Sequence, residues 1–192
     1  MTEPQQTEPQ QTGHQQPEPQ AKAPVAILIG PPGAGKTTVG TLLAELLGVS
    51  FTDTDTEIEA AAGKPVSDIF VEDGEPAFRE LERAAVADVL VRSDGVVAVG
   101  GGAILDPNTQ QRLGGRPVVY LETGFAAAAK RVGLSQARPL LIGTNPRATL
   151  KALLDQRLPI YTSLAWLTVS TDDQPPEHIA AEIASHLAAA RP

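Results

Sequence analysis

The sequence has no cysteine and few aromatic residues, with one Trp, two Tyr and four Phe among its 192 residues. The absence of cysteine excludes disulfide bonds and any metal site that is built from thiolates. The three histidines, His14, His178 and His186, are too scattered to form a pattern of metal ligands. The first apolar run, VAILIG, is too short for a membrane span or for the apolar part of a signal peptide. We therefore expect a cytoplasmic protein without a membrane partner.

Positive charge is also scarce, because 15 Lys and Arg stand against 23 Asp and Glu, which gives a net charge of −8. A protein that binds nucleic acid needs a basic face, so the composition argues against that class of partner. It does not exclude a small anionic substrate, since a few clustered arginines can create a local positive site. We expect a monomer that acts on small molecules.

The N-terminal residues 1–23 contain a tandem repeat of TEPQQ and almost nothing that could be buried. Such a segment cannot offset the entropy lost on ordering, so we predict a disordered tail. A role in binding a partner stays open as the alternative. The remaining residues 24–192, in a chain that is 42% hydrophobic, suffice for one domain with one compact core.

From Pro24 onward, predicted strands alternate with predicted helices. Strands are expected at residues 25–29, 49–52, 95–100, 117–122 and 166–170. The first of these is a continuous apolar run, which is typical of a strand in a parallel sheet covered on both faces. The alternation predicts a three-layer α/β fold with a parallel sheet.

The predicted helices begin and end at recognisable residues. The first has an apolar stripe, Val39, Leu42, Leu43, Leu46 and Leu47, and ends at Gly48. Further helices are expected at about 55–62, from about Pro76, from Asp106-Pro107, from a Thr123 cap to about Val132, from Asn145-Pro146, and at the C-terminus. The helix from Asn145-Pro146 contains Pro159, which should kink or interrupt it.

The stretch GPPGAGKTT, residues 30–38, matches the phosphate-binding pattern G-x-x-x-x-G-K-[ST]. It follows the apolar strand and opens an amphipathic helix, so a glycine-rich turn without a ligand is the weaker alternative. The residues expected to hold the phosphates are Gly33, Ala34, Gly35, Lys36, Thr37 and Thr38. Lys36 would reach the β- and γ-phosphates and Thr37 would offer its hydroxyl to Mg²⁺. The chain is short and lacks the NKxD motif of GTPases, which favours a kinase of a small metabolite.

Asp53 and Asp55 stand two positions apart at the end of the second predicted strand, within FTDTDTEIEA. Alternation along a strand would point both carboxylates to the same side. Because two neighbouring anions repel each other, a cation or hydroxyl donors should lie beside them. The alternative is that both are ordinary turn or cap residues before the next helix.

Two other features fit a binding site. Gly100, Gly101 and Gly102 follow a buried strand at its carboxyl end, where ligands of open α/β sheets bind, and their N–H groups can bind substrate oxygens. The irregular stretch at residues 131–145 is long enough for a lid that keeps water from the phosphoryl group. Arg79 and Arg157, taken alone, would be interpreted as surface residues, with Arg79 paired to Glu75 four residues earlier.

Taken together, GPPGAGKTT, DTD, GEPAFRELE, VGGGAIL, ARPLL and QRLPIY resemble the shikimate kinases in order and spacing. The resemblance covers about residues 24–190. It implies a P-loop kinase fold with a five-stranded parallel sheet in the order 2-3-1-4-5. It also implies transfer of the γ-phosphate of ATP to the 3-hydroxyl of shikimate, giving shikimate 3-phosphate and ADP, a step in aromatic amino-acid biosynthesis.

The resemblance assigns roles to individual residues. Asp53 would bind Mg²⁺ or one of its waters beside Thr37, whereas Asp55 would face the substrate and orient the attacking hydroxyl. Arg79 and Arg157 would bind the carboxylate of shikimate, and the glycines 100–102 would approach its oxygens.

Two further arginines are assigned to the nucleotide side. Arg138, in a lid at about 133–145, would meet both substrates and the developing phosphoryl charge. Arg131 would pack on the adenine. The chain departs from the family after the last strand, where STDDQPPEH is acidic and contains no arginine, so the adenine would rest on Pro175 or Pro176 and the backbone.

Two other functions remain open at this point. A gluconate-type sugar acid kinase would share the P-loop and the size of the chain, but not the combination of DTD, GGG and RPLL. A nucleotide-binding module without catalysis would share the fold, although all the expected catalytic side chains are present.

Overall fold

The computed structural model describes residues 23–133 and 146–190. The N-terminal tail, and all of the predicted lid except Gly133, lie outside the described residues, and so does Arg138.

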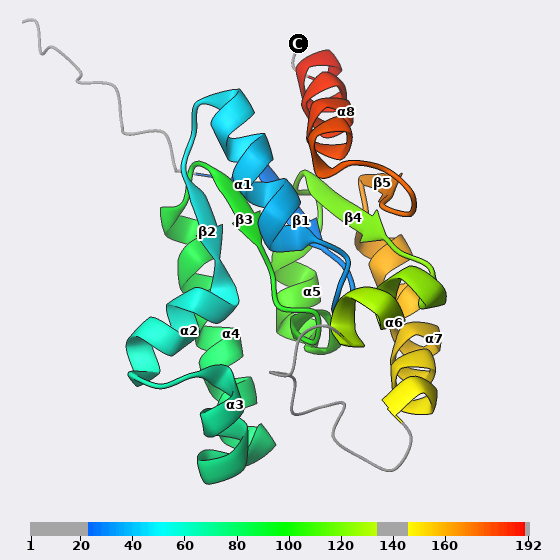
Figure 1. Ribbon diagram of the computed structural model, residues 1–192. Helices are drawn as coiled ribbons and strands as arrows, with labels where there is room; N and C mark the ends of the chain where they lie inside the picture. Colours follow the sequence, from blue (N-terminus) through cyan, green and yellow to red (C-terminus); the bar gives the residue numbers. More distant parts are fainter. Residues whose placement is uncertain (1–22, 134–145, 191–192) are drawn as a thin grey trace, which may run out of the picture.

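The described residues form one parallel sheet of five strands in the order β2-β3-β1-β4-β5, which confirms the expected topology (Figure 1). The strands are β1 (Ala26–Ile29), β2 (Phe51–Asp53), β3 (Val96–Ala98), β4 (Val118–Glu122) and β5 (Leu167–Ser170). β1 lies in the centre and all four of its residues are buried. A continuous apolar run is required at this place because both faces of the strand are covered.

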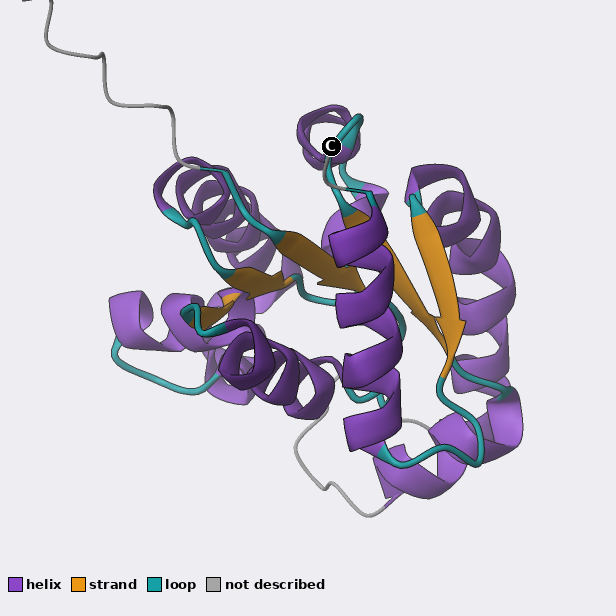
Figure 2. Cartoon of the chain, turned by 90° about the horizontal axis from the view of Figure 1, so that it is seen from above, coloured by secondary structure: helices purple, strands orange, loops and turns teal. Residues whose placement is uncertain are grey.

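Helices cover both faces of the sheet (Figure 2). They are α1 (Lys36–Leu47), α2 (Thr54–Ala62), α3 (Val66–Asp68), α4 (Gly74–Arg92), α5 (Pro107–Leu113), α6 (Phe125–Gly133), α7 (Pro146–Leu164) and α8 (Pro176–Ala189). Two shorter turns complete the set, a π-helix η1 (Ile69–Asp73) and a 3₁₀-helix η2 (Ala103–Leu105). The expected end of α1 at Gly48 is confirmed, and Gly63 ends α2 in the same way, since both glycines adopt the left-handed conformation. The expected Asp106 cap is confirmed too, since its side chain accepts the Thr109 N–H.

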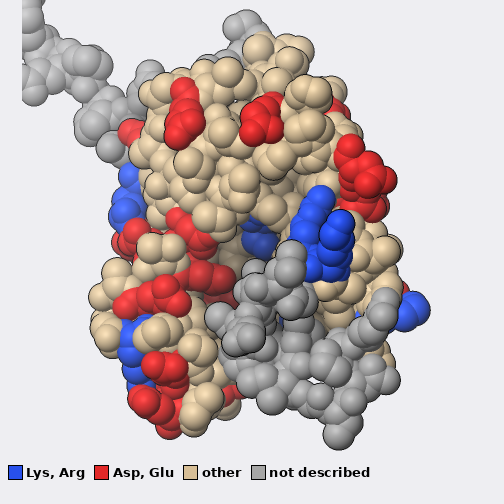
Figure 3. Space-filling view, in the orientation of Figure 1, with Lys and Arg blue, Asp and Glu red and all other residues tan. Residues whose placement is uncertain are grey.

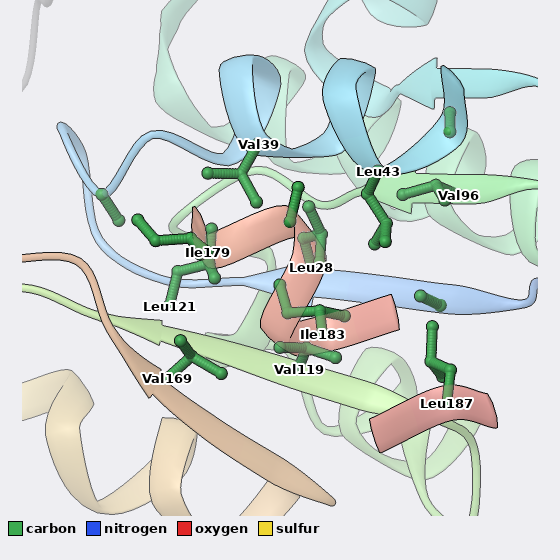
Figure 4. Packing of buried hydrophobic residues seen from close by; sticks show 14 residues of the cluster. Leu28, Val39, Leu43, Val96, Val119, Leu121, Val169, Ile179, Ile183 and Leu187 are labelled. Carbon is green, nitrogen blue, oxygen red and sulfur yellow. The ribbon is translucent and has the colours of Figure 1, made fainter. Parts of the chain in front are cut away.

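Each face of the sheet has its own core. On one face, α1 and α8 pack on the strands through residues such as Leu43 and Ile183, both fully buried (Figure 4). On the other face, α4, α5 and α7 pack on the alternate strand residues, such as Ile27 and Val97. The alternation of side chains along each strand separates the two cores.

The predicted stripe of α1 is wrong at Leu46, which is 58% exposed. The inward face of the helix carries the small residues Gly40 and Ala44 instead. A Cβ on Gly40 would overlap the ring of Phe51, so the small residue lets α1 lie close to β2. The prediction was based on the positions of large apolar residues, whereas the close approach of α1 to β2 requires small residues at the contact.

Of the two outcomes predicted at Pro159, the interruption is wrong, because α7 continues through it from Pro146 to Leu164. A kink at this position stays a prediction. Proline in a helix interior costs roughly 3 kcal/mol, since it removes a hydrogen bond and crowds the preceding turn. Here Pro159 is exposed, while Arg157 and Tyr161 on either side of it are 3% and 1% exposed. Tertiary packing of these two neighbours holds the helix together across the proline.

The sequence did not predict α3 and η1, which lie between α2 and α4. Ile69, the first residue of η1, is fully buried against Ile58 of α2 and Phe78 of α4. These residues form a small third core, and η1 leads directly into the helix that carries Arg79. Within the described part of the chain, no helix is long and apolar enough to cross a membrane.

Gly95→Ala should destabilise the fold, because a Cβ at this position would overlap the backbone carbonyl of Ser50 beside β2. Backbone atoms cannot rotate away, so we expect a loss of about 2–3 kcal/mol and a fall in melting temperature on the order of 5–10 °C. Thermal unfolding checks this. Gly114→Ala is the control, because Gly114 is exposed, has φ −54° and leaves room for a Cβ. Equal melting temperatures for the two variants would contradict the account of strand packing.

Candidate active site

The carboxyl ends of β2, β3 and β1 lie side by side, because the three strands are parallel neighbours. The loops that leave these ends carry most of the residues predicted for the site. The molecule is hollowed at this edge, with acidic side chains gathered over α2 and basic ones over the end of α6 (Figure 3).

The phosphate loop connects β1 to the N-terminus of α1, as the motif predicts. Gly33 and Gly35 have φ values of 81° and 88°, a left-handed conformation that glycine adopts without strain. The ammonium group of Lys36 donates to the carbonyls of Gly30 at 2.8 Å and Pro31 at 3.2 Å. The loop thus presents a positive charge at the positive end of the α1 dipole, which suits a phosphate.

Asp53 is the last residue of β2 and makes two contacts with different parts of the molecule. Its Oδ2 accepts the hydroxyl of Thr37 at 2.8 Å, and its Oδ1 accepts the Asp55 N–H at 3.0 Å and so caps α2. The interpretation of Asp53 as a helix cap is confirmed, and the residue also contacts the threonine of the phosphate loop; its role as a ligand of Mg²⁺ stays a prediction.

Asp55 does not lie on a strand, so the predicted alternation of the two carboxylates is wrong. It belongs to the first turn of α2, because β2 ends at Asp53 and the cap turns the chain there. The side chain of Asp55 lies against the loop after β3, where a Cβ on Gly100 would be 2.7 Å from its Oδ1. The helix turn directs the two carboxylates to different neighbours, and this reduces their repulsion.

The three glycines after β3 leave room for side chains of the chain itself. A Cβ on Gly100 would crowd Asp55 and Glu82, and one on Gly102 would lie 2.5 Å from Nη1 of Arg79. The N–H of Gly100 donates to the buried Thr54 hydroxyl at 3.0 Å, so this N–H is already engaged and does not face a substrate. The loop brings charged groups to the end of a buried strand.

Arg79 binds two carboxylates of its own helix. The expected pair with Glu75 is present at 2.9 Å, and a second pair joins Arg79 Nη1 to Glu82 at 2.6 Å. Burial alone would lower the pKa of Arg79, but the two carboxylates outweigh it and the net shift is upward. The guanidinium therefore stays charged and is held toward the loop after β3.

Sequence reasoning missed Glu82, although it lies three residues after Arg79, a spacing at which helix side chains meet. Only 3% of it is exposed. Burial raises the pKa of the Glu82 carboxyl, and the charge of Arg79 offsets this only in part. A carboxylate on the apolar side of α4 was not expected because charged residues are rarely buried without a partner.

Arg157 lies inside the molecule rather than on its surface. Its Nη1 donates to the carbonyl of Gly101 at 2.9 Å, and the same oxygen accepts the hydroxyl of Tyr161 at 2.6 Å. The Nε of Arg157 is buried and has no hydrogen-bond partner among the described residues. A buried guanidinium N–H is costly to leave unsatisfied, so this atom is suited to an oxygen of a ligand.

Arg131 joins α6 to the phosphate loop and to the end of β5. Its guanidinium donates to the carbonyl of Gly33 at 3.3 Å, and to the hydroxyl and carbonyl of Thr171 at 3.0 and 2.6 Å. The residue thus lies beside the phosphate loop and the end of β5, and its contact with adenine stays a prediction.

The acidic segment after β5 has a structural role that the sequence did not reveal. Asp172 accepts the N–H of Gly124 at 2.9 Å and the hydroxyl of Thr123 at 3.1 Å. The prediction that Thr123 caps the following helix is wrong, because α6 begins at Phe125 and the Thr123 hydroxyl donates to Asp172. A carboxylate at the N-terminus of α6 interacts favourably with the helix dipole, and its hydrogen bonds connect this helix to the segment after β5.

Within residues 23–133 and 146–190, no group of three or more His, Asp or Glu residues lies close enough to hold a metal ion. The Thr37 hydroxyl and the Asp53 carboxylate are the pair that fits Mg²⁺. Both are hard oxygen ligands, and Mg²⁺ in kinases takes few protein ligands and keeps waters and phosphate oxygens.

A phosphate loop on one strand and a buried arginine beside the glycine loop of the next strand define a P-loop kinase that acts on a small anionic molecule. The family model described as shikimate kinase matches residues 32–188. The chain belongs to the shikimate kinase family.

Individual relatives agree with this membership. The chain is 66% identical to the shikimate kinase of Thermobifida fusca over 167 residues, which cover 87% of this chain and 96% of that protein. It is 58% identical to the shikimate kinase of Salinispora arenicola, over 87% of this chain and 99% of that protein. Among solved structures, a shikimate kinase from Acinetobacter baumannii in complex with shikimate aligns with a TM-score of 0.83 and 38% identity, over 88% of this chain and 94% of that chain.

Proposed function

We infer that this chain transfers the γ-phosphate of ATP to the 3-hydroxyl of shikimate, giving shikimate 3-phosphate and ADP. The activity belongs to aromatic amino-acid biosynthesis. The observation that carries the inference is the family match over residues 32–188 in a chain whose phosphate loop lies beside a buried arginine site. Gluconate-type kinases share the loop, but the relatives of this chain are shikimate kinases.

For the nucleotide, we propose that the phosphates bind over the residues Gly33, Ala34, Gly35, Lys36, Thr37 and Thr38. Lys36 now donates to two loop carbonyls, and a bound phosphate would offer its ammonium group stronger, charged acceptors. Arg131 is proposed to contact the adenine, which its position between the phosphate loop and the end of β5 supports.

For the metal, we propose that Thr37 and Asp53 hold Mg²⁺ or its waters. Bound there, Mg²⁺ would neutralise charge on the β- and γ-phosphates. The contact of 2.8 Å between the two side chains supports this assignment, as it brings the two oxygens to one place at the N-terminus of α1.

For the acceptor, we propose that Asp55 orients the 3-hydroxyl and takes its proton as the bond from that oxygen to the γ-phosphorus forms. The bond between this phosphorus and the oxygen it shares with the β-phosphate breaks in the same transfer. Arg79, Arg157 and the loop of Gly101 and Gly102 would bind the carboxylate of shikimate, which needs fixed positive charge.

Arg138, outside the described residues, is proposed to contact the transferring phosphoryl group from the lid at about 133–145. This role rests on the resemblance of ARPLL to the family motif. A monomer in the cytoplasm without a nucleic-acid or membrane partner is likewise a proposal. The net charge of −8 supports the part that concerns nucleic acid.

The function predicts release of ADP that depends on both shikimate and Mg²⁺. A coupled ADP-release assay on the full chain measures this, with gluconate as the control acceptor. We expect turnover with shikimate and only background with gluconate or with no acceptor. Background release in the presence of folded protein, ATP, Mg²⁺ and shikimate would overturn the assignment.

The two aspartates should fail in different ways when each is changed to Asn. Asp55→Asn should abolish most of the turnover and leave ATP binding intact, because it removes the proton acceptor. Asp53→Asn should mainly raise the Mg²⁺ concentration needed for half-maximal rate, because an amide is a weaker ligand. Activity measured over a range of Mg²⁺ concentrations separates the two. Superimposable Mg²⁺ curves, each scaled to its own maximum, would refute this division of roles.

A further inference from the structure

The carbonyl oxygen of Gly101 is a meeting point of two buried side chains of α7. The Tyr161 hydroxyl donates to it at 2.6 Å and Nη1 of Arg157 donates to it at 2.9 Å. The two donors are four residues apart, so they lie on one face of the helix. Only 1% of Tyr161 and 3% of Arg157 is exposed, so both donor side chains are shielded from water.

Gly101 is held on its other side by the phosphate loop. A Cβ on Gly101 would lie 3.2 Å from the carbonyl oxygen of Gly30 and 3.4 Å from Cδ of Pro32. The residue is therefore enclosed between α7 and the loop that would bind ATP. Gly101 thus borders both halves of the site.

A peptide between two glycines has little intrinsic preference for one orientation, because glycine populates φ of either sign. The hydrogen bonds to the Gly101 carbonyl must therefore select the orientation of the peptide. The peptide is planar and trans, so a carbonyl of Gly101 that points to α7 directs the N–H of Gly102 away from α7. That N–H belongs to the loop proposed to bind the substrate.

The ring of Tyr161 is positioned independently of its hydroxyl. It stacks on the ring of Tyr120 from β4, with centroids 5.0 Å apart and planes 9° apart. Burial raises the pKa of both phenols, to about 12 for Tyr120, so each hydroxyl keeps its proton at physiological pH. The stacked ring thus holds the protonated Tyr161 hydroxyl where it donates to the Gly101 carbonyl.

We propose that Tyr161 is a positioning residue for shikimate binding: its hydroxyl fixes the Gly101–Gly102 peptide, and through the shared carbonyl it fixes the guanidinium of Arg157. The Nε of Arg157, buried and without a partner among the described residues, is then directed at the substrate. Tyr161 does not touch the substrate. The proposal rests on the function inferred above and names a residue that acts behind the site.

Tyr161→Phe removes the hydroxyl and keeps the stacked ring. We expect the dissociation constant and the KM for shikimate to rise roughly fivefold to thirtyfold. A rise of this size corresponds to the loss of one buried hydrogen bond together with a poorer orientation of the charged hydrogen bond from Arg157 to the substrate. The KM for ATP should stay within about twofold, because the phosphate loop keeps its own contacts. Calorimetric titration of shikimate and steady-state kinetics on the full chain measure these values.

Tyr120→Phe is the matched control, because it removes a hydroxyl from the same stacked pair that makes no hydrogen bond to the glycine loop in the described structure. Its constants should equal those of the unchanged chain, and melting temperatures should show that both variants fold. A merely structural role of Tyr161 would lower the melting temperature without separating the two KM values.

A double variant tests the route through Arg157. In an Arg157→Lys background, Tyr161→Phe should weaken shikimate binding much less than it does alone, since the group that it positions is gone. Equal effects in the two backgrounds would overturn the proposal, as would an unchanged KM for shikimate in Tyr161→Phe. Failure of the unchanged chain to bind shikimate would instead refute the proposed function.

Discussion

The parallel pairing of β1 with β3 is the constraint on which the site depends. It brings the phosphate loop after β1 against the glycine loop after β3, so closely that a Cβ on Gly101 would approach the carbonyl of Gly30. Two loops that are about 70 residues apart in sequence thereby become adjacent. A donor phosphate and an acceptor hydroxyl can then meet in line without a large movement of the core. Glycine is required at this contact because backbone lies against backbone.

Charge is arranged in the site against the net acidity of the chain. Each described arginine of the site is held by an acceptor of the protein: Glu82 holds Arg79, Gly101 holds Arg157, and Thr171 holds Arg131. Carbonyl acceptors fix the direction of a guanidinium without neutralising its charge, whereas a carboxylate also reduces the field that a ligand feels. Arg157, which is only 3% exposed, is held by a carbonyl and by no carboxylate of the described residues, and this leaves its charge for a ligand.

Much of the fold followed from the sequence, since the alternation of strands and helices, the glycine stops and the phosphate motif are local signals. Asp55 was misplaced because the cap at Asp53 ends the strand two residues before Asp55, so that alternation along a strand no longer applies there. Glu82 and Tyr161 were missed because their importance comes from partners brought near by the tertiary fold. The Tyr161 hydroxyl meets a carbonyl 60 residues away in sequence, and no periodicity signals such a contact. The resemblance supplied Arg157, which composition alone would have put on the surface.

The central claim is that one site beside the glycine loop holds the carboxylate of shikimate at Arg79 and Arg157 and its 3-hydroxyl at Asp55. A crystal structure of the chain with shikimate, Mg²⁺ and an ATP analogue that cannot transfer its phosphate tests it most directly. The account predicts the carboxylate at about 3 Å from the guanidinium groups of Arg79 and Arg157, and the 3-hydroxyl at a similar distance from Asp55. A carboxylate bound away from both arginines, or Asp55 in place of Asp53 on the metal, would contradict it.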